Sequence, residues 1–159
     1  MKKRTGREAG ERTNPGAGLA LLALALMAAP GRADEAGLTV GGSISFRKTG
    51  SIYVSLVTED EYKRPDLAEH RFSLVLEPTQ AELRAGRMRY SMRNVPAGTY
   101  ALRAFQDVNG NGRLDSGIFG PTEPWCIYRL RLPAFRAPRF DEIRFELRSS
   151  TDSLDLDLI

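Results

Sequence analysis

Along most of this chain apolar and polar side chains alternate, and a period of two leaves few folds open. From Leu38 to Phe46 every second residue is apolar or Gly, with Thr, Ser or Gly between them. This pattern is typical of a β-strand with one buried face, whereas a helix repeats its apolar residues every three to four positions. Similar runs of alternation or shared-face apolar residues recur at 52–56, 72–76, 87–93, 99–106, 126–132, 143–147 and 154–158.

The eight runs are short, and Gly- or Pro-rich turns such as 94–98 separate them. Short helical turns are expected near 66–69 and at 80–85, but no segment of ten residues carries a sustained helical stripe. Without crossover helices the strands cannot form βαβ units and should pair antiparallel. The sequence therefore predicts an all-β fold, a two-sheet antiparallel β-sandwich of about seven to eight strands.

Residues 1–33 are predicted to be a cleaved signal peptide. A basic leader precedes an apolar stretch at 19–29, and Gly31 and Ala33 stand three and one residues before Asp34. As a helix that stretch spans roughly 16 Å, which is too short for a hydrocarbon core of about 30 Å. The alternative is an uncleaved anchoring N-terminus. We expect one domain at 34–159, periplasmic or secreted, with no stable membrane span after cleavage.

Charge and Cys/His content exclude several classes of function. The whole chain has a formal charge of +3, but residues 1–33 hold six of its 23 Lys and Arg and two of its 20 Asp and Glu. The predicted mature part is therefore close to −1, and it offers no field for a nucleic-acid backbone. One Cys and one His exclude an intramolecular disulfide, a Cys/His zinc site and a redox Cys pair.

Asp and Asn occupy alternate positions in the segment Asp-Val-Asn-Gly-Asn-Gly-Arg-Leu-Asp at 107–115. Oxygen-bearing side chains at positions 1, 3, 5 and 9, with Gly at 6 and a carbonyl at 7, have the spacing of a calcium loop of the EF-hand type. Position 12 is Ile118 instead of a bidentate Glu, so Glu123 is expected to fold back as the missing ligand. The predicted set is Asp107, Asn109, Asn111, Asp115, Glu123 and the carbonyl of Arg113.

Calcium should bind this set weakly, with a dissociation constant on the order of 10⁻⁴ to 10⁻³ M. Magnesium fits less well because it demands a rigid octahedral site. The alternative is that Asp and Asn are turn residues whose side chains bond the local backbone, with Gly110 and Gly112 taking positive φ. The sequence leaves both interpretations open.

The segment 100–115, followed by Phe-Gly-Pro-Thr-Glu-Pro at 119–124, resembles the signature of the bacterial exported family called domain of unknown function 2141. Val-Pro-Ala-Gly-Thr-Tyr at 95–100 and Pro-Arg-Phe-Asp-Glu-Ile-Arg-Phe at 138–145 are similar to its flanking segments. The resemblance implies a prealbumin-like or immunoglobulin-like sandwich and brings no established activity. Trp-Cys-Ile-Tyr at 125–128 stands where the family usually has Gly-Phe-Ser, so the resemblance carries over no ligand contact of that segment.

Two reactive side chains are interpreted as structural. His70 has no catalytic partner at a recognisable spacing, because Ser73 lies three residues away and on the opposite face of a strand. Cys126 falls in the inward register of an apolar strand, which favours a buried thiol over pairing with another chain.

Two surface features have both a binding and a structural interpretation. Phe119, Trp125 and Tyr128 could form an aromatic platform for a sugar, although aromatic residues at a sandwich end are more often rim packing. Arg87, Arg89 and Arg93 share one strand face, which could bind anionic glycan or lipid or be paired with acids such as Asp155 and Asp157.

Three classes of function follow. The first is a non-catalytic exported module that binds an envelope protein or glycan, with calcium fixing its loop. The second is an envelope glycan or anionic lipid binder that uses the arginine row. The third, a hydrolase using Asp107, Asp115 or Glu123, is disfavoured because no positioned partner is evident. We therefore expect no enzymatic activity.

Overall fold

The computed structural model describes residues 37–63, 70–118, 120–130 and 136–158. The predicted signal peptide, the helical turn at 66–69, Phe119 and Leu132 lie outside them. The strands are β1 (Leu38–Phe46), β2 (Ser51–Val57), β3 (Phe72–Leu76), β4 (Arg87–Val95), β5 (Gly98–Asp107), β6 (Ser116–Gly117), β7 (Gly120–Pro121), β8 (Trp125–Ile127), β9 (Phe145–Leu147) and β10 (Leu156–Leu158). Three short helices join them, α1 (Glu59–Tyr62), α2 (Gln80–Ala85) and α3 (Phe140–Ile143).

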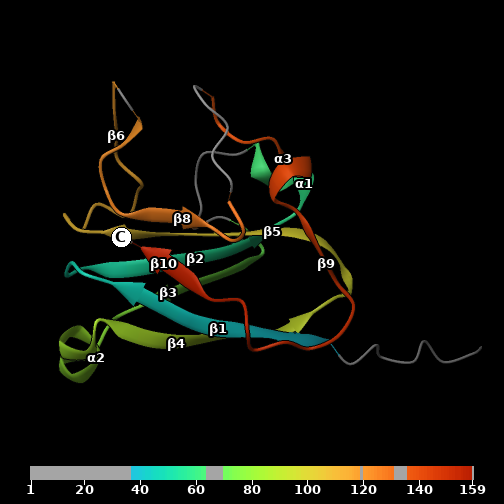
Figure 1. Cartoon of the computed structure of the whole chain (residues 1–159), viewed down its shortest axis with the longest axis horizontal. Coiled ribbons are helices and arrows are strands. Elements are labelled where there is room, and N and C mark those ends of the chain that lie inside the picture. The colour runs from blue at the N-terminus through green and yellow to red at the C-terminus, as the bar shows by residue number, and fades with distance from the viewer. Residues whose placement is uncertain (1–36, 64–69, 119, 131–135, 159) are drawn as a thin grey trace, which may run out of the picture. The chain divides into compact units, whose positions relative to one another are not determined.

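Two sheets face each other and form the predicted all-β sandwich (Figure 1). The first has the order β10-β1-β4 and the second β3-β2-β5-β8, with β9 pairing the first residues of β5. β6 and β7 form a separate two-stranded hairpin. All these pairs are antiparallel except β1 with β10, which is parallel and departs from the uniformly antiparallel expectation.

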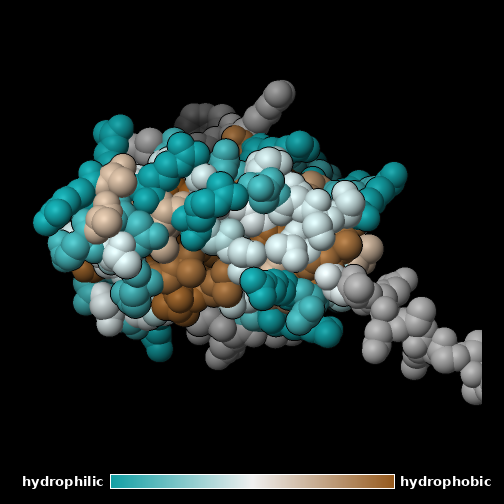
Figure 2. Space-filling model, turned by 90° about the horizontal axis from the view of Figure 1, so that it is seen from below, coloured by the Kyte–Doolittle hydropathy of each residue, from teal (hydrophilic) through white to brown (hydrophobic). Residues whose placement is uncertain are grey.

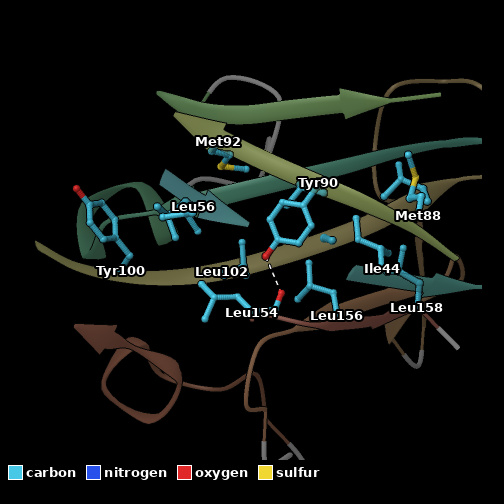
Figure 3. Close-up of a cluster of buried hydrophobic side chains, with 14 of the residues drawn as sticks. Ile44, Leu56, Met88, Tyr90, Met92, Tyr100, Leu102, Leu154, Leu156 and Leu158 are labelled. Atoms are coloured by element: carbon cyan, nitrogen blue, oxygen red, sulfur yellow. Dashed lines mark hydrogen bonds between the residues drawn. The ribbon is translucent and has the colours of Figure 1, made fainter. Parts of the chain in front are cut away.

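The main core fills the space between the sheets with the inward residues of their alternating strands. Figure 3 shows Ile44 and Tyr90 of the first sheet directed toward Leu56 and Leu102 of the second. The Tyr90 hydroxyl donates a hydrogen bond of 2.7 Å to the carbonyl of Leu154, which satisfies the one polar group that this ring buries. Burial also raises the pKa of Tyr90. The alternation seen in the sequence thus predicts the core face correctly.

A second, smaller core covers the other face of the β2-β5-β8 sheet. Its buried members are Val57, Ala101, Ile127 and Ile143. α1 and α3 supply aromatic residues to this cluster, with Tyr62 and Phe140 at a ring-centroid distance of 6.0 Å. The sheet that carries the calcium-like loop is therefore buried on both faces over part of its length.

Several element boundaries differ from the sequence expectation. β8 ends at Ile127, because the chain turns at Tyr128 and Arg129, where Arg129 has a φ of 57° and the Leu130 N–H bonds the Ile127 carbonyl at 3.1 Å. The strand expected to include Ile143 instead begins at Phe145, since Ile143 closes α3. Leu154 precedes β10 and is not part of it.

The helices are one or two turns long and are fixed at their starts. Thr58 and Thr79 each form a capping box with the Glu three residues on, at the beginning of α1 and α2. α2 was expected at 80–85, whereas α1 lies in a segment interpreted as a connection. In the described ranges we find no helix with the length and apolarity needed to cross a bilayer.

Candidate functional site

The calcium-like loop connects β5 to β8, two strands that lie side by side in one sheet. Asp107 is the last residue of β5, and Trp125, the first of β8, pairs with Phe105. The chain between them leaves the sheet, makes the β6–β7 hairpin and returns, as Figure 1 shows at its upper left. A loop that starts and ends on neighbouring strands is anchored at both ends by the sheet itself.

Asp107 organises the first half of this loop. Its side chain is only 2% exposed. One carboxylate oxygen accepts the N–H groups of Gly110 at 2.7 Å and Asn111 at 3.1 Å, and the other accepts that of Gly112 at 2.7 Å. Gly110 and Gly112 have φ of 76° and 75°, a left-handed conformation that favours glycine. The predicted positive φ at these two positions is confirmed.

Glu123 closes the loop from its other end. This side chain is 8% exposed, and its two oxygens accept the N–H groups of Val108 at 2.8 Å and Asp115 at 3.1 Å. Glu123 thus folds back onto the loop, as expected, and it joins the first and last residues of the 108–115 segment. Its oxygens are engaged by backbone donors in this arrangement.

Asn109, Asn111 and Asp115 bring their side chains together at the loop surface. The amide nitrogen of Asn109 donates to Asp115 at 2.6 Å, and that of Asn111 donates to both Asp115 oxygens at 3.0 and 3.1 Å. The two amide oxygens accept the N–H groups of Asn111 and Arg113 at 3.1 and 2.9 Å. Positions 3, 5 and 9 therefore converge, but amide nitrogens rather than oxygens face the carboxylate.

The remaining positions of the predicted set contribute less. Arg113 is exposed, and its N–H bonds Asn111. Ile118, at position 12, directly follows β6 in the hairpin and is 96% exposed. Among the described residues, no group of three or more His, Cys, Asp or Glu side chains is arranged to hold a metal ion. A cation at this loop would have to use Asn amide oxygens beside the carboxylates.

The two described residues of the predicted aromatic platform, Trp125 and Tyr128, pack in different clusters. Trp125 packs in the smaller core, whereas Tyr128 packs against the main core and meets Phe145 edge-on at a centroid distance of 5.6 Å. Phe119 lies outside the described residues. The positions of Trp125 and Tyr128 agree with the rim-packing interpretation.

The arginine row on β4 is exposed, with inward Met88, Tyr90 and Met92 between its members. Arg89 lies 3.6 Å from Asp152, and this surface pair is the ion pair seen for the row within the described part of the chain. Asp155 instead accepts the backbone N–H of Ser43 at 2.8 Å.

Sequence reasoning missed a buried polar cluster on the other face of β5. His70 is 4% exposed, and its Nε2 lies within hydrogen-bond distance of the Arg103 guanidinium, which also stacks over Tyr62. Burial lowers the pKa of Arg103 to about 10. The Ser73 hydroxyl donates to the His70 backbone carbonyl at 2.9 Å. The sequence does contain a signal for this cluster, because Arg103 lies between apolar residues on one face of a strand and a buried Arg needs a polar partner.

Cys126 is half-buried and packs against the main core. Burial raises the pKa of its thiol to about 12. The thiol is therefore protonated at neutral pH and a poor nucleophile.

Comparison with known proteins gives one match. A family model described as an uncharacterized protein conserved in bacteria (DUF2141) matches residues 45–154, which is more than half of the chain. No curated protein and no solved structure matches the chain. The matched segment runs from the end of β1 through β9 and includes the whole loop from Asp107 to Glu123, whereas β10 lies beyond it.

Proposed function

Since the chain belongs to this family of uncharacterized bacterial proteins, we propose that it is a non-catalytic binding or structural module exported to the cell envelope. Its loop between β5 and β8 is a fixed support that presents the β6–β7 hairpin and neighbouring side chains to an envelope protein or glycan.

One observation carries this proposal. The two buried acids of the loop, Asp107 and Glu123, accept five backbone N–H groups between them. A general acid or base must exchange its proton with a substrate, and it must reach that substrate. Carboxylates directed at the backbone of their own loop instead fix its conformation, as a binding surface requires.

Calcium would strengthen the same support. The side-chain amides of Asn109 and Asn111 both lie within hydrogen-bond distance of the Asp115 carboxylate, which favours a shared cation. Binding requires both amides to turn their oxygens inward, so the hydrogen bonds that they make to Asp115 and to the N–H groups of Asn111 and Arg113 are lost. We therefore propose a weak site, in the range of about 10⁻⁴ to 10⁻³ M.

Thermal melts in calcium and in a chelator test the cation. Calcium at tenfold over its dissociation constant, on the order of 10 mM, should stabilise the protein by about 1.4 kcal/mol. Asp115→Asn should abolish the shift, whereas Asp152→Asn, which removes an equally negative but distant side chain, should preserve it. Identical melts with and without calcium would remove the ion from the proposal and leave the hydrogen-bonded support.

Export and binding need separate tests. N-terminal sequencing of protein recovered from the periplasm or medium should begin at Asp34. Immobilised protein should then capture an envelope component, and deletion of the hairpin residues 116–121 should reduce that capture while the fold remains. Retention of the whole chain in the cytoplasm, or capture unaffected by the deletion, would contradict the proposal.

A second candidate is an anionic glycan or lipid binder, and the exposed arginine row favours it. Arg87, Arg89 and Arg93 lie on one side of β4, and the acids predicted to neutralise them are not their partners in the described ion pairs. We expect salt-sensitive retention on an anionic polysaccharide that is lost when all three become Ala. A triple Ala variant at the exposed Arg47, Arg84 and Arg148 removes the same charge and should be retained.

A further inference from the structure

Strand β3 is an edge of the larger sheet and lacks the charges that usually protect an edge. It pairs with β2, and no other strand of the described chain pairs with it. Its sequence, Phe-Ser-Leu-Val-Leu, is uncharged, and Val75 is 53% exposed. Phe72, Leu74 and Leu76 pack against the main core but stay partly exposed. Such an edge is a template for pairing with another strand.

The edge of the smaller sheet shows the contrast. β4 runs along that edge with its outward positions occupied by Arg87, Arg89, Ser91 and Arg93. Like charges disfavour the approach of a second copy there. Seen from below, the surface shows a hydrophobic patch among hydrophilic side chains (Figure 2).

We propose that β3 pairs antiparallel with β3 of a second copy of this chain, around a two-fold axis at Leu74. The residues that flank the strand make the pairing self-complementary, because Arg71 precedes it and Glu77 follows it. With Leu74 opposite Leu74, each Arg71 lies opposite a Glu77, and both ends of the strand pair gain an attractive contact.

The same register matches the two faces of the strand. Phe72 lies opposite Leu76 on the side of the core, so the apolar interior continues across the axis. Ser73 lies opposite Val75 on the outer side, where it covers the exposed Val75. Shifting the register by two residues removes the opposition of Arg71 and Glu77, so charge selects this alignment.

Sedimentation of the protein, purified as the cell produces it, over a range of concentrations tests the pairing. We expect a reversible dimer. Glu77→Arg places like charges opposite each other at both ends and should weaken the dimer by about tenfold. The double variant Arg71→Glu with Glu77→Arg exchanges the charges and should restore it. Arg89→Glu, a charge reversal on the other edge, should leave the dimer unchanged.

A cysteine in place of Leu74 tests the axis directly. Opposite residues of antiparallel strands have Cα atoms roughly 4.5 to 5.5 Å apart, within reach of a disulfide. Leu74→Cys should give a covalent dimer on mild oxidation, whereas the wild type, whose only Cys is the core-packed Cys126, should not. A chain that is monomeric at every concentration, or a dimer indifferent to both Glu77→Arg and the double variant, would overturn the proposal.

Discussion

Between the two sheets, aliphatic and methionine side chains exclude water, whereas between β5 and β8 two carboxylates hold a loop by accepting backbone N–H groups. The main core includes side chains that are 0% exposed from both sheets, such as Ile44 and Leu102. The loop contributes no buried apolar side chain between Val108 and Leu114. The free energy gained by burying apolar side chains does not depend on the direction in which they meet, but a hydrogen bond is lost when its geometry changes.

The difference teaches how an irregular segment can be fixed without a core of its own. The main core sets the stability of the whole molecule, because each sheet needs the other to bury its inward face. The Asp107 and Glu123 network sets the shape of one connection. Mutations in the two regions should therefore differ in how much unfolding free energy they cost and in how far through the molecule their effect extends. The following predictions test this difference.

Leu102→Ala should have the largest effect. The side chain is fully buried on β5 between the sheets, so truncation leaves a cavity and loses about 2–5 kcal/mol of unfolding free energy. Urea unfolding followed by circular dichroism measures the loss, and hydrogen exchange should accelerate in both sheets. A loss below about 1 kcal/mol would show that this region does not dominate stability.

Asp107→Ala should come next and should act locally. Three loop N–H groups lose their acceptor, at a cost of about 1–3 kcal/mol. Exchange should accelerate at Gly110, Asn111 and Gly112, while β1 and β4 keep their protection. Asp107→Asn retains one acceptor oxygen and should fall between Ala and wild type. Equal acceleration throughout the sheets would contradict a local role.

Glu142 extends the comparison to α3. Like the loop acids it accepts a backbone N–H group, but it is exposed and also accepts hydrogen bonds from an Arg side chain. Hydrogen bonding to Arg136 and then to the Arg139 N–H lowers its pKa to about 2, from the usual 4.5. A lowered folded-state pKa stabilises the protein above the unfolded pKa, and this contribution disappears as the pH falls from about 4.5 to 2. Glu142→Gln should flatten the decline of Tm in that window, whereas Asp141→Asn, on the same helix, should retain it. Superimposable curves for wild type and Glu142→Gln would contradict this assignment.

Asn109→Ala should have the smallest effect on stability. Its hydrogen bonds to Asp115 and to the Asn111 N–H are exposed, so the change in unfolding free energy should stay within about 0.5 kcal/mol. The same variant should nevertheless weaken calcium binding at the proposed site, as measured by calorimetry. A large loss of stability would mean that the loop surface, and not its buried acids, holds its shape.

The sequence predicted the sandwich well because period-two alternation reports burial directly. β1 to β5 follow their apolar residues closely. The predicted end of β8 was wrong because the alternation continues to Leu132, whereas the chain turns at Arg129. No pattern of hydropathy encodes the positive φ of Arg129. α1 was missed because four polar residues carry no helical stripe, although Thr58 and Glu61 form a capping box that the sequence does contain.

For the site, spacing predicted which side chains would meet but not how they would be oriented. Asn109, Asn111 and Asp115 do converge, and Glu123 does fold back. Whether an Asn presents oxygen or nitrogen depends on the backbone N–H groups around it, and these follow from the folded loop. The contact between His70 and Arg103 spans 33 residues and joins two elements, so local sequence could not reveal it.

The single Cys makes the separation of two strands measurable. Cys126 pairs with Ala104 where β8 borders β5, and its half-buried sulfur should react faster with a labelling reagent when the two strands separate. The rate of labelling therefore reports on the opening of the pair between β5 and β8, the strand into which the loop leads, and needs no added probe.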